Sequence, residues 1–364
     1  MAERTDETEG PDGPITIDEL QLATRNHGMP LEALRWSRTP VGLHYVLVHY
    51  DIPRVDADTW SLEIGGRVTQ SRRLTLADLR ARPQATAVTT MECAGNGRAL
   101  LEPRPISQPW LLEAVGTAEW RGTRLAPLLE EAGPAADGRE VVFTGVDGGV
   151  EGGTAQQYQR SLTLDECLAG DALLAYEMND APLPPQHGYP VRLVVPGWYG
   201  MTNVKWLQSI DVIAEPFEGY QQATAYRLRQ ERDEPGEPVT RMLPRSLMVP
   251  PGVPDFMTRR RFVSVGRHTI EGRAWTGWGT IEAVDVSTDD GKSWSPAELE
   301  PAVDGHPAAW RRWTWGWDVA APGEYQLCCR ARDSAGYSQP VDDRWNYHGY
   351  SNNRVQRVAV TVES

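Results

Sequence analysis

The stretch Met91-Glu92-Cys93-Ala94-Gly95-Asn96-Gly97-Arg98 is the part of the sequence on which the prediction of the fold depends. The apolar, β-branched run at residues 87–90 leads into it and predicts a strand. Two glycines then allow the chain to turn tightly and to approach a bound group closely. A cysteine at a strand end, near the basic Arg98, can be held as a thiolate, and thiolates bind soft metals. The alternative is a buried structural cysteine, because a single cysteine is a weak signal for a metal site.

Length and charge limit the kind of protein. The chain has 364 residues, enough for two domains, and its 40% apolar content is that of a globular protein. The formal net charge of −14 argues against a nucleic-acid partner. The four cysteines have neither the spacing of a disulfide framework nor that of a zinc site.

The first residues carry no targeting signal. Residues 1–14 are acidic and polar, without the basic and apolar regions of a secretory leader, and we expect a disordered tail. No later segment has the roughly 18–20 apolar residues that a membrane span needs. The sequence therefore predicts a cytoplasmic protein without a membrane partner.

Short strands alternate with short helices up to about residue 214. We expect strands at 43–50, 60–64, 140–146, 172–177 and 191–197, and helices at 74–80, 127–132 and 161–168. Thr75 is the expected N-cap of the first helix, with Asp78 at the capping-box position. The pattern is typical of an α+β domain and not of a doubly wound sheet, and it contains no phosphate-binding glycine motif.

From Gly266 the sequence predicts only strands, at 268–275, 281–287, 310–319 and 323–332. Asp290-Gly291 is a hairpin signal, and Trp313, Trp315 and Trp317 alternate so that they share one face of a strand. These features predict an immunoglobulin-like sandwich. Residues 215–254, rich in Pro, Glu and Arg, predict a long linker.

The octapeptide as a whole resembles the molybdenum-binding loop of the sulfite oxidase family of molybdopterin enzymes. The resemblance implies that Cys93 is the only protein ligand of molybdenum, which a single molybdopterin holds. It implies an α+β fold: a lead-in segment (1–34), a sulfite-oxidase-type mixed α+β molybdopterin core (35–235), and an all-β immunoglobulin-like sandwich domain (236–364). In that family the last domain forms a homodimer, so we expect one here.

Three further segments resemble the cofactor-binding stretches of the family, namely residues 174–179, 187–192 and 204–207. A phosphorylated cofactor needs cations and fixed hydrogen-bond donors. The resemblance implies that the cofactor-binding residues are Tyr45, His49, Cys93, Asp147, His187, Arg192 and Lys205. Each also has a structural explanation when taken alone, such as a turn histidine for His187.

The resemblance also implies an activity, oxygen-atom transfer on a small sulfur-containing substrate. Tyr226 falls where the family places a tyrosine beside the reactive oxygen, and a tyrosine hydroxyl can stabilise charge there. The expected catalytic residues are therefore Cys93, Tyr226 and Arg98, although Tyr226 has an alternative role as a packed aromatic. The sequence contains no haem or flavin motif, so electrons would pass to a separate acceptor, a cytochrome or oxygen.

The resemblance to the family is incomplete in the expected substrate pocket, which comprises Arg98, Leu47 and His348. Sulfite-oxidising members hold their dianionic substrate with three arginines, and Leu47 and His348 replace two of them. Two unit charges about 4 Å apart interact by roughly 4 kcal/mol at an effective dielectric near 20, so the dianion would bind far more weakly. The substrate would then be less charged, such as a sulfoxide, an N-oxide or a neutral organic sulfur compound.

Arg25-Asn26-His27 suggests a replacement for one lost arginine. It repeats the Arg-Asn-His letters of the family about twenty residues earlier than expected. One hypothesis is that this segment folds over the pocket and supplies Arg25, and the alternative is coincidence.

Two other functions stay open. The first is a reductase of S- or N-oxides with the same cofactor, which the altered pocket favours. The second is a non-catalytic protein that binds a partner through its tryptophan-rich sandwich, which the presence of Cys93 argues against.

Overall fold

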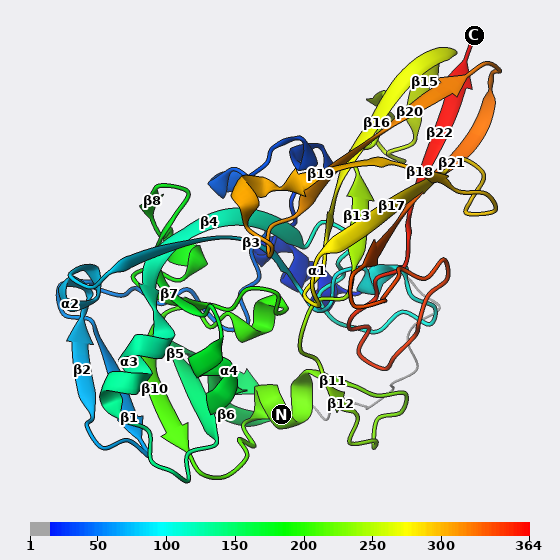
Figure 1. Ribbon diagram of the computed structural model, residues 1–364. Coiled ribbons are helices and arrows are strands. Elements are labelled where there is room, and N and C mark those ends of the chain that lie inside the picture. The colour runs from blue at the N-terminus through cyan, green and yellow to red at the C-terminus, as the bar shows by residue number, and fades with distance from the viewer. Residues whose placement is uncertain (1–14) are drawn as a thin grey trace.

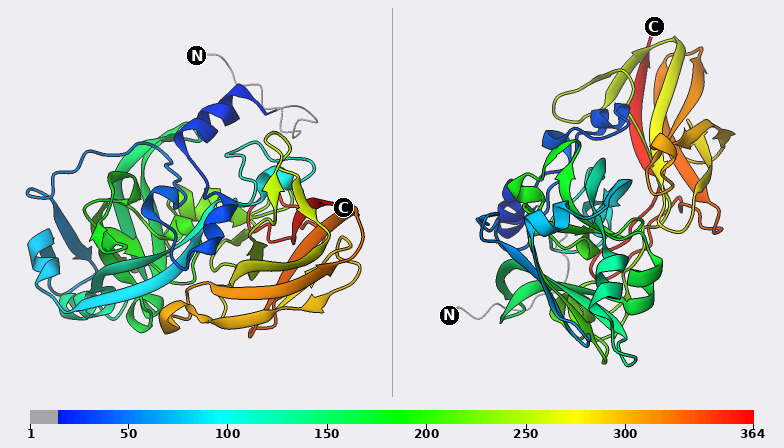
Figure 2. Two further views of the ribbon diagram at one scale, coloured as in Figure 1. Left: turned by 90° about the horizontal axis from the view of Figure 1, so that it is seen from above. Right: turned by 60° about the vertical axis from the view of Figure 1, so that its left-hand side comes forward.

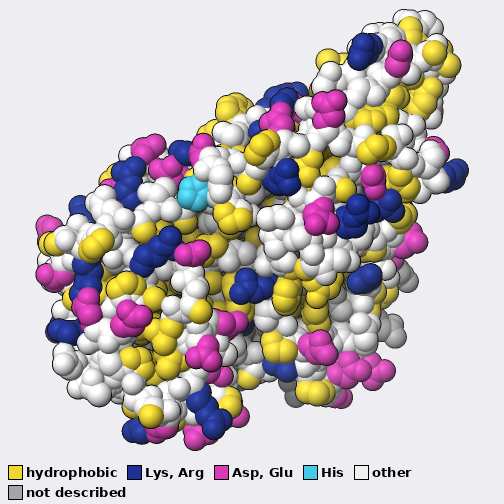
Figure 3. Space-filling view, viewed as in Figure 1, with side chains coloured by type: hydrophobic (Ala, Val, Ile, Leu, Met, Phe, Trp, Pro, Cys, Tyr) yellow, Lys and Arg dark blue, Asp and Glu magenta, His cyan; other side chains and the backbone are white. Residues whose placement is uncertain are grey.

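The computed structural model describes residues 15–364, which form a broad first lobe and a narrower second lobe (Figures 1 and 2). The acidic tail predicted at residues 1–14 lies outside the described residues. The second lobe projects from the first and carries the C-terminus at its far end. On the face drawn in Figure 3, acidic and basic side chains are interspersed over both lobes.

Two sheets build the first lobe. One has the strand order β2-β1-β10-β5-β6, and the other has the order β3-β4-β7-β8 with β9 paired to β7. Only the β1–β10 pair is parallel among these described strands. The strands are β1 (Ser61–Gly66), β2 (Arg72–Thr75), β3 (Gln84–Glu92), β4 (Val115–Arg124), β5 (Glu140–Glu151), β6 (Thr154–Thr163), β7 (Leu173–Met178), β8 (Ala181–Pro182), β9 (Arg192–Val194) and β10 (Leu207–Ile213).

Three short helices pack on these sheets: α2 (Leu76–Arg80), α3 (Leu125–Ala132) and α4 (Leu164–Ala169). Thr75 caps α2 in a capping box with Asp78, as predicted, and Thr163 caps α4 in the same way with Glu166. The apolar faces of the helices and sheets meet in one core that includes Leu62, Leu129, Phe143, Leu174 and Ile210. No helix within residues 15–364 is long and apolar enough to cross a membrane.

The second lobe is the predicted all-β sandwich. A sheet of order β13-β16-β20-β19 faces one of order β14-β15-β22-β21-β17-β18. Trp313 and Trp317 are buried between them, and Trp315 packs partly buried on the same face, as the alternation predicts. The strands are β13 (Arg245–Met248), β14 (Val253–Pro254), β15 (Arg261–Ser264), β16 (Gly266–Trp275), β17 (Ile281–Ser287), β18 (Ser295–Pro296), β19 (Glu298–Ala302), β20 (Arg311–Val319), β21 (Gly323–Asp333) and β22 (Gln356–Glu363).

The lead-in segment fastens the two lobes together. It contains α1 (Ile17–Arg25) and a short 3-10 helix, Leu31–Arg35. On the first lobe, the Met29 amide donates to the carbonyl of Glu113 at 2.8 Å. On the second lobe, Arg273 Nε donates to the carbonyl of Leu34 at 2.8 Å. The segment is therefore an integral part of both lobes.

The strand predicted at residues 43–50 is wrong. A 3-10 helix, Val41–Leu43, is followed by irregular chain whose only bridge in the described structure joins Val46 to His27. Side chains form hydrogen bonds with the backbone groups that would pair with a neighbouring strand in a sheet. The Val48 amide donates to Asn26 Oδ1 at 2.7 Å, and the Leu47 carbonyl accepts from Lys205 Nζ at 2.8 Å. The apolar residues of 43–50 are therefore explained by burial and not by strand pairing.

The linker predicted at residues 215–254 is partly wrong, because it contains regular structure. A π-helix (Gln221–Ala225) and the short hairpin β11 (Arg227–Leu228) and β12 (Glu237–Pro238) lie within it, and β13 starts the second lobe at Arg245.

The strand β4 (Val115–Arg124) was not predicted from the sequence. Gly122 interrupts the strand pattern there, yet a Cβ at this position would lie 2.0 Å from the Leu174 carbonyl, so the close pairing of β4 with β7 requires glycine.

The cap of α4 provides a test of the fold. Thr163→Ala removes the side chain that accepts from the Glu166 amide, and we expect it to lower the free energy of unfolding by about 1 kcal/mol. Denaturant unfolding measures this change. Thr154→Ala, an exposed threonine at the start of β6 with no cap to lose, is the control. Equal destabilisation by both variants would contradict the capping role.

Candidate active site

The Cys93 loop is a tight turn at the end of β3. The Cys93 amide donates to the Ala114 carbonyl at 2.9 Å, and the Asn96 amide donates back to the Cys93 carbonyl at 3.0 Å. Gly97 has a φ of 91°, which favours glycine. A Cβ on Gly95 would lie 2.7 Å from the Arg98 guanidinium carbon. Both glycines are therefore needed, one for backbone conformation and one for the close approach of Arg98.

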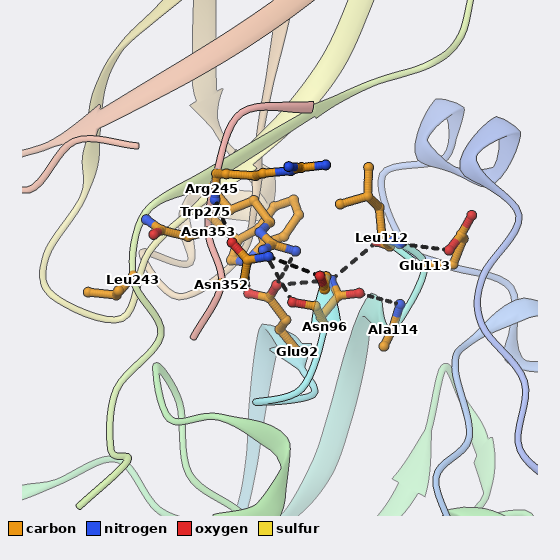
Figure 4. A network of polar contacts seen from close by, with 12 residues as sticks. Glu92, Asn96, Leu112, Glu113, Ala114, Leu243, Arg245, Trp275, Asn352 and Asn353 are labelled. Atoms are coloured by element: carbon orange, nitrogen blue, oxygen red, sulfur yellow. Dashed lines mark hydrogen bonds and ion pairs between the residues drawn. The ribbon is translucent and has the colours of Figure 1, made fainter. Parts of the chain in front are cut away.

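A buried polar network centred on Glu92 holds this turn (Figure 4). One carboxylate oxygen accepts from Asn96 Nδ2 at 3.0 Å and lies 3.0 Å from Arg245 Nη1, and the other accepts from Trp275 Nε1 at 2.9 Å. The side chains of the ion pair are each only 2% exposed. Arg245 and Trp275 belong to β13 and β16, so the second lobe positions the cysteine loop.

Residues near the C-terminus clamp the same loop. The Ser351 amide donates to the Ala94 carbonyl at 2.7 Å, and Asn352 Nδ2 donates to the Gly97 carbonyl at 2.9 Å. Arg98 Nε donates to the His348 carbonyl at 2.6 Å. The predicted pocket residue His348 thus meets the site through its backbone, and its ring lines neither of the two cavities described below.

The inner cavity has a volume of about 50 Å³, and Cys93 lies in its wall. All seven predicted cofactor-binding residues line it, although they come from well-separated segments: Tyr45, His49, Cys93, Asp147, His187, Arg192 and Lys205. Leu47 and Tyr226 complete part of the wall, and Arg98 does not line it. The structure therefore brings together the residues that the family resemblance selected.

Two cations in the inner cavity lack carboxylate partners. The Arg192 guanidinium donates to two backbone carbonyls at 3.0 Å, and Lys205 Nζ donates to the carbonyls of Leu47 and Gln186 at 2.8 and 3.1 Å. No ion pair with a carboxylate forms at either cation within residues 15–364. Burial lowers the pKa of Lys205 to about 7 and that of Arg192 to about 10. Such cations are suited to a phosphate group.

Unpaired polar atoms show that the inner cavity fits a hydrogen-bonding cofactor. His44 Nε2, His187 Nε2 and Asp147 Oδ1 are buried without a partner. Burial lowers the pKa of His44 to about 4 and that of His187 to about 2, and it raises the pKa of Asp147 to about 6. Buried polar groups are normally paired, so these three atoms indicate a ligand with complementary donors and acceptors.

A second, outer cavity has a volume of about 380 Å³, and Cys93 lies in its wall too. It shares Leu47, His49, Cys93 and Tyr226 with the inner cavity. His49 Nε2 and the Tyr226 hydroxyl form a hydrogen bond of 2.6 Å at this junction. The rest of the wall includes the predicted residue Arg98 together with Arg25, Gln108, Trp110, Glu151 and Tyr350.

Sequence reasoning missed a buried arginine behind Tyr226. The Arg160 guanidinium lies 5.6 Å from the centre of the Tyr226 ring and donates to the Gln221 carbonyl. Burial lowers its pKa, and it forms no ion pair with a carboxylate in the described part of the chain. Trp110 was also missed. No spacing rule connects Arg160 to Tyr226 or Trp110 to Cys93, because these residues come from different strands and loops.

The expectation that the loop alone stabilises a thiolate is not met. Burial raises the pKa of the Cys93 thiol, and this outweighs the lowering by Arg98, by the Gly95 amide and by the Trp110 side chain. Direct bonding to a metal ion deprotonates a thiol, so a thiolate at this position requires the metal. No group of three or more His, Cys, Asp or Glu side chains within residues 15–364 could hold a metal ion. A metal at Cys93 therefore needs ligands from a cofactor.

Comparison with known proteins agrees with this geometry. Residues 49–221 match the oxidoreductase molybdopterin binding domain, and residues 245–363 match the Mo-co oxidoreductase dimerisation domain. Fold and site thus define an oxidoreductase that binds molybdenum-molybdopterin. Sulfite oxidase of Gallus gallus is 34% identical over 328 residues, covering 85% of this chain and 70% of that protein. The chain belongs to the sulfite oxidase family.

Two further relatives extend the comparison. The sulfane dehydrogenase SoxCD of Paracoccus pantotrophus has a similar structure, with a TM-score of 0.80 and 27% identity over 100% of this chain and 96% of that one. A nitrate reductase [NAD(P)H] of Hordeum vulgare is 32% identical over 89% of this chain. The chain spans 39% of that reductase and 61–62% of the rat and human sulfite oxidases. Family membership therefore leaves the substrate open.

The Glu92–Arg245 pair predicts a strong effect of a conservative change. Glu92→Gln leaves the Arg245 charge buried without its counter-ion, and breaking a buried pair in this way destabilises by about 3–5 kcal/mol. We expect a lower unfolding midpoint together with a lower molybdenum content. Glu271→Gln, which breaks a partly exposed pair with Arg312, is the control and should cost about 1 kcal/mol or less. Equal unfolding midpoints for Glu92→Gln and wild type would contradict the role of the network.

The enclosed lysine predicts a pH dependence of the cofactor-free protein. Burial lowers the pKa of Lys205 from 10.5 to about 7, so between these values the unfolded chain binds one more proton than the folded chain. The stability that depends on neutral Lys205 therefore rises with pH between about 7 and 10.5, and it is already lost at pH values below 7. Urea unfolding between pH 6.5 and 9.5 should show this rise in wild type and a smaller one in Lys205→Met. The same slope in both proteins would contradict the lowered pKa.

Proposed function

We propose that the protein is a molybdenum-dependent oxidoreductase that transfers an oxygen atom on a small sulfur-containing substrate, with Cys93 as the protein ligand of molybdenum. One observation carries the proposal. Cys93 lies at the junction of two cavities, one whose unpaired polar atoms fit the cofactor and one that is open for a substrate. A structural cysteine has no reason to occupy such a junction.

The surrounding residues have distinct proposed roles. The bound cofactor supplies a two-electron redox centre and an exchangeable oxygen. Burial lowers the pKa of His49 to about 3 and raises that of Tyr226 well above its ordinary value, so both are neutral at pH 7. Their hydrogen bond holds a protonated phenol at the junction, where it can donate to an oxygen of the substrate. Leu47 and Trp110 limit the access of water.

A reductase of S- or N-oxides is the second candidate. The nitrate reductase among the relatives shows that the family includes reductases, and Leu47 makes the pocket less suited to a dianion than an arginine would. Two assays separate the directions of the reaction. One uses one-electron acceptors to detect oxidation, the other uses reduced dyes to detect reduction, and both are run with sulfite, sulfoxides and N-oxides. Turnover only in the reducing direction would favour this candidate.

The remaining assignments are also proposals. We propose a homodimer through residues 236–364, which the match to the dimerisation domain supports, and a separate electron acceptor. The cytoplasmic location stays a prediction from the sequence.

Metal analysis is the first test of Cys93. Wild type from a host that makes the cofactor should carry about one molybdenum and one pterin per chain, with a thiolate-to-metal charge-transfer band. Cys93→Ser should lose that band or the metal. Cys328→Ser, a buried cysteine of the second lobe, is the control and should keep both. Well-folded wild type without molybdenum would refute the proposal.

A further inference from the structure

The end of α1 brings a second cation to the outer cavity. Arg25 lies in the wall of this cavity with Arg98 and with Cys93. Arg25 forms no ion pair within residues 15–364, and Arg98 makes its contacts with the His348 and Gln108 carbonyls and with the Tyr350 ring. Two guanidinium groups therefore face one cavity without carboxylate partners.

Several contacts fix α1 in this position. Asn26, the next residue, accepts from the Val48 amide at 2.7 Å and donates to Gln108 Oε1 at 3.0 Å. His27 forms a two-bond bridge with Val46, at 3.1 and 2.9 Å. These bonds fasten the chain after Arg25 to both residues that flank Leu47. The position of Arg25 is thus fixed by the bonds of the two residues that follow it.

The helix is also anchored at its other end. The carboxylate of Glu19 is buried, closes a capping box with Thr16 and forms an ion pair with Arg104. The ion pair joins α1 to the loop that also carries Gln108 and Trp110. A helix held at both ends can present its last side chain to the cavity in a defined position.

The charges of the outer cavity favour an anion. Its single lining carboxylate, Glu151, already accepts from Gln221 Nε2 at 2.6 Å and from the Tyr50 hydroxyl at 3.1 Å. The pKa of His49 is lowered by burial, then by the Lys205 charge and then by the Arg25 charge, so the positive field of Arg25 reaches the junction. A cavity with unpaired positive charge concentrates negative ligands.

We propose that Arg25 and Arg98 form an anion-binding subsite in the outer cavity, and that the substrate is therefore a sulfur compound with a negative charge. This deepens the proposed function and rests on it. Arg25 supplies, from an earlier segment, the guanidinium that is absent at Leu47. The subsite favours sulfite or an organic sulfinate over a neutral sulfoxide, in contrast to the expectation from Leu47 and His348 alone.

Three non-reacting tetrahedral sulfur probes of equal shape isolate the charge. Sulfate carries two negative charges, methanesulfonate carries one, and dimethyl sulfone carries none. Calorimetric titration of the holoenzyme with each probe gives affinities without turnover. The variants are Arg25→Ala, Arg25→Gln and Arg25→Lys. Arg267→Ala, which removes an exposed arginine of the second lobe, is the control for net charge.

Wild type should bind the two anions more tightly than the sulfone. Arg25→Ala and Arg25→Gln should weaken both anions by about 3- to 10-fold and leave the sulfone unchanged, with recovery in Arg25→Lys and a smaller effect at high salt. Equal affinities in wild type, Arg25→Gln and Arg267→Ala would overturn the subsite, as would equal weakening of all three probes. The titrations involve no turnover, so they test the subsite separately from the activity. If wild type shows no activity while Arg25→Gln still loses anion binding, only the proposed function is refuted.

Discussion

The buried ion pair between Glu92 and Arg245 is the constraint on which the site depends. It joins the residue before Cys93 to the first strand of the second lobe, and Trp275 donates to the same carboxylate. A charged pair in so enclosed a position is stable only when each partner is present and oriented. The geometry of the cysteine loop is therefore a property of the whole chain. The second lobe, in addition to its match to a dimerisation domain, completes the active site.

The site is organised as two cavities that share Cys93 in their walls. On the inner side, Arg192 and Lys205 donate to backbone carbonyls and form no ion pair with a carboxylate in the described part of the chain, and unpaired histidine and aspartate atoms belong to the wall. On the outer side, the cations belong to Arg25 and Arg98, and Leu47 and Trp110 are apolar. Under the proposed function, this separation would give cofactor binding and substrate selection to different residues, and the two cavities share Leu47, His49, Cys93 and Tyr226.

Much of this arrangement follows from the sequence because it depends on local rules. The glycines around Asn96, the cap at Thr75 and the alternating tryptophans of β20 act within a few residues, so their patterns are readable. The inner-cavity residues were found only through their resemblance to a family. Neither the local rules nor the resemblance predicted Arg160 and Trp110, because nothing in their spacing shows that the fold brings Arg160 to Tyr226 and Trp110 to the outer cavity. The false strand at 43–50 arose because enclosed chain and paired strand have the same apolar composition.

The position of Arg25, Leu47 and Tyr226 along the chain has a consequence for how such proteins diverge. All three line the outer cavity, yet Arg25 and Leu47 lie before, and Tyr226 lies between, the two segments 49–221 and 245–363 that match the family domains. The charge in the outer cavity can therefore change in the connecting segments as well as at Arg98, while most of the predicted cofactor-binding residues, which lie within 49–221, stay the same. Relatives with the same core can therefore differ in the molecules that they accept, and part of that difference lies in residues outside the shared domains.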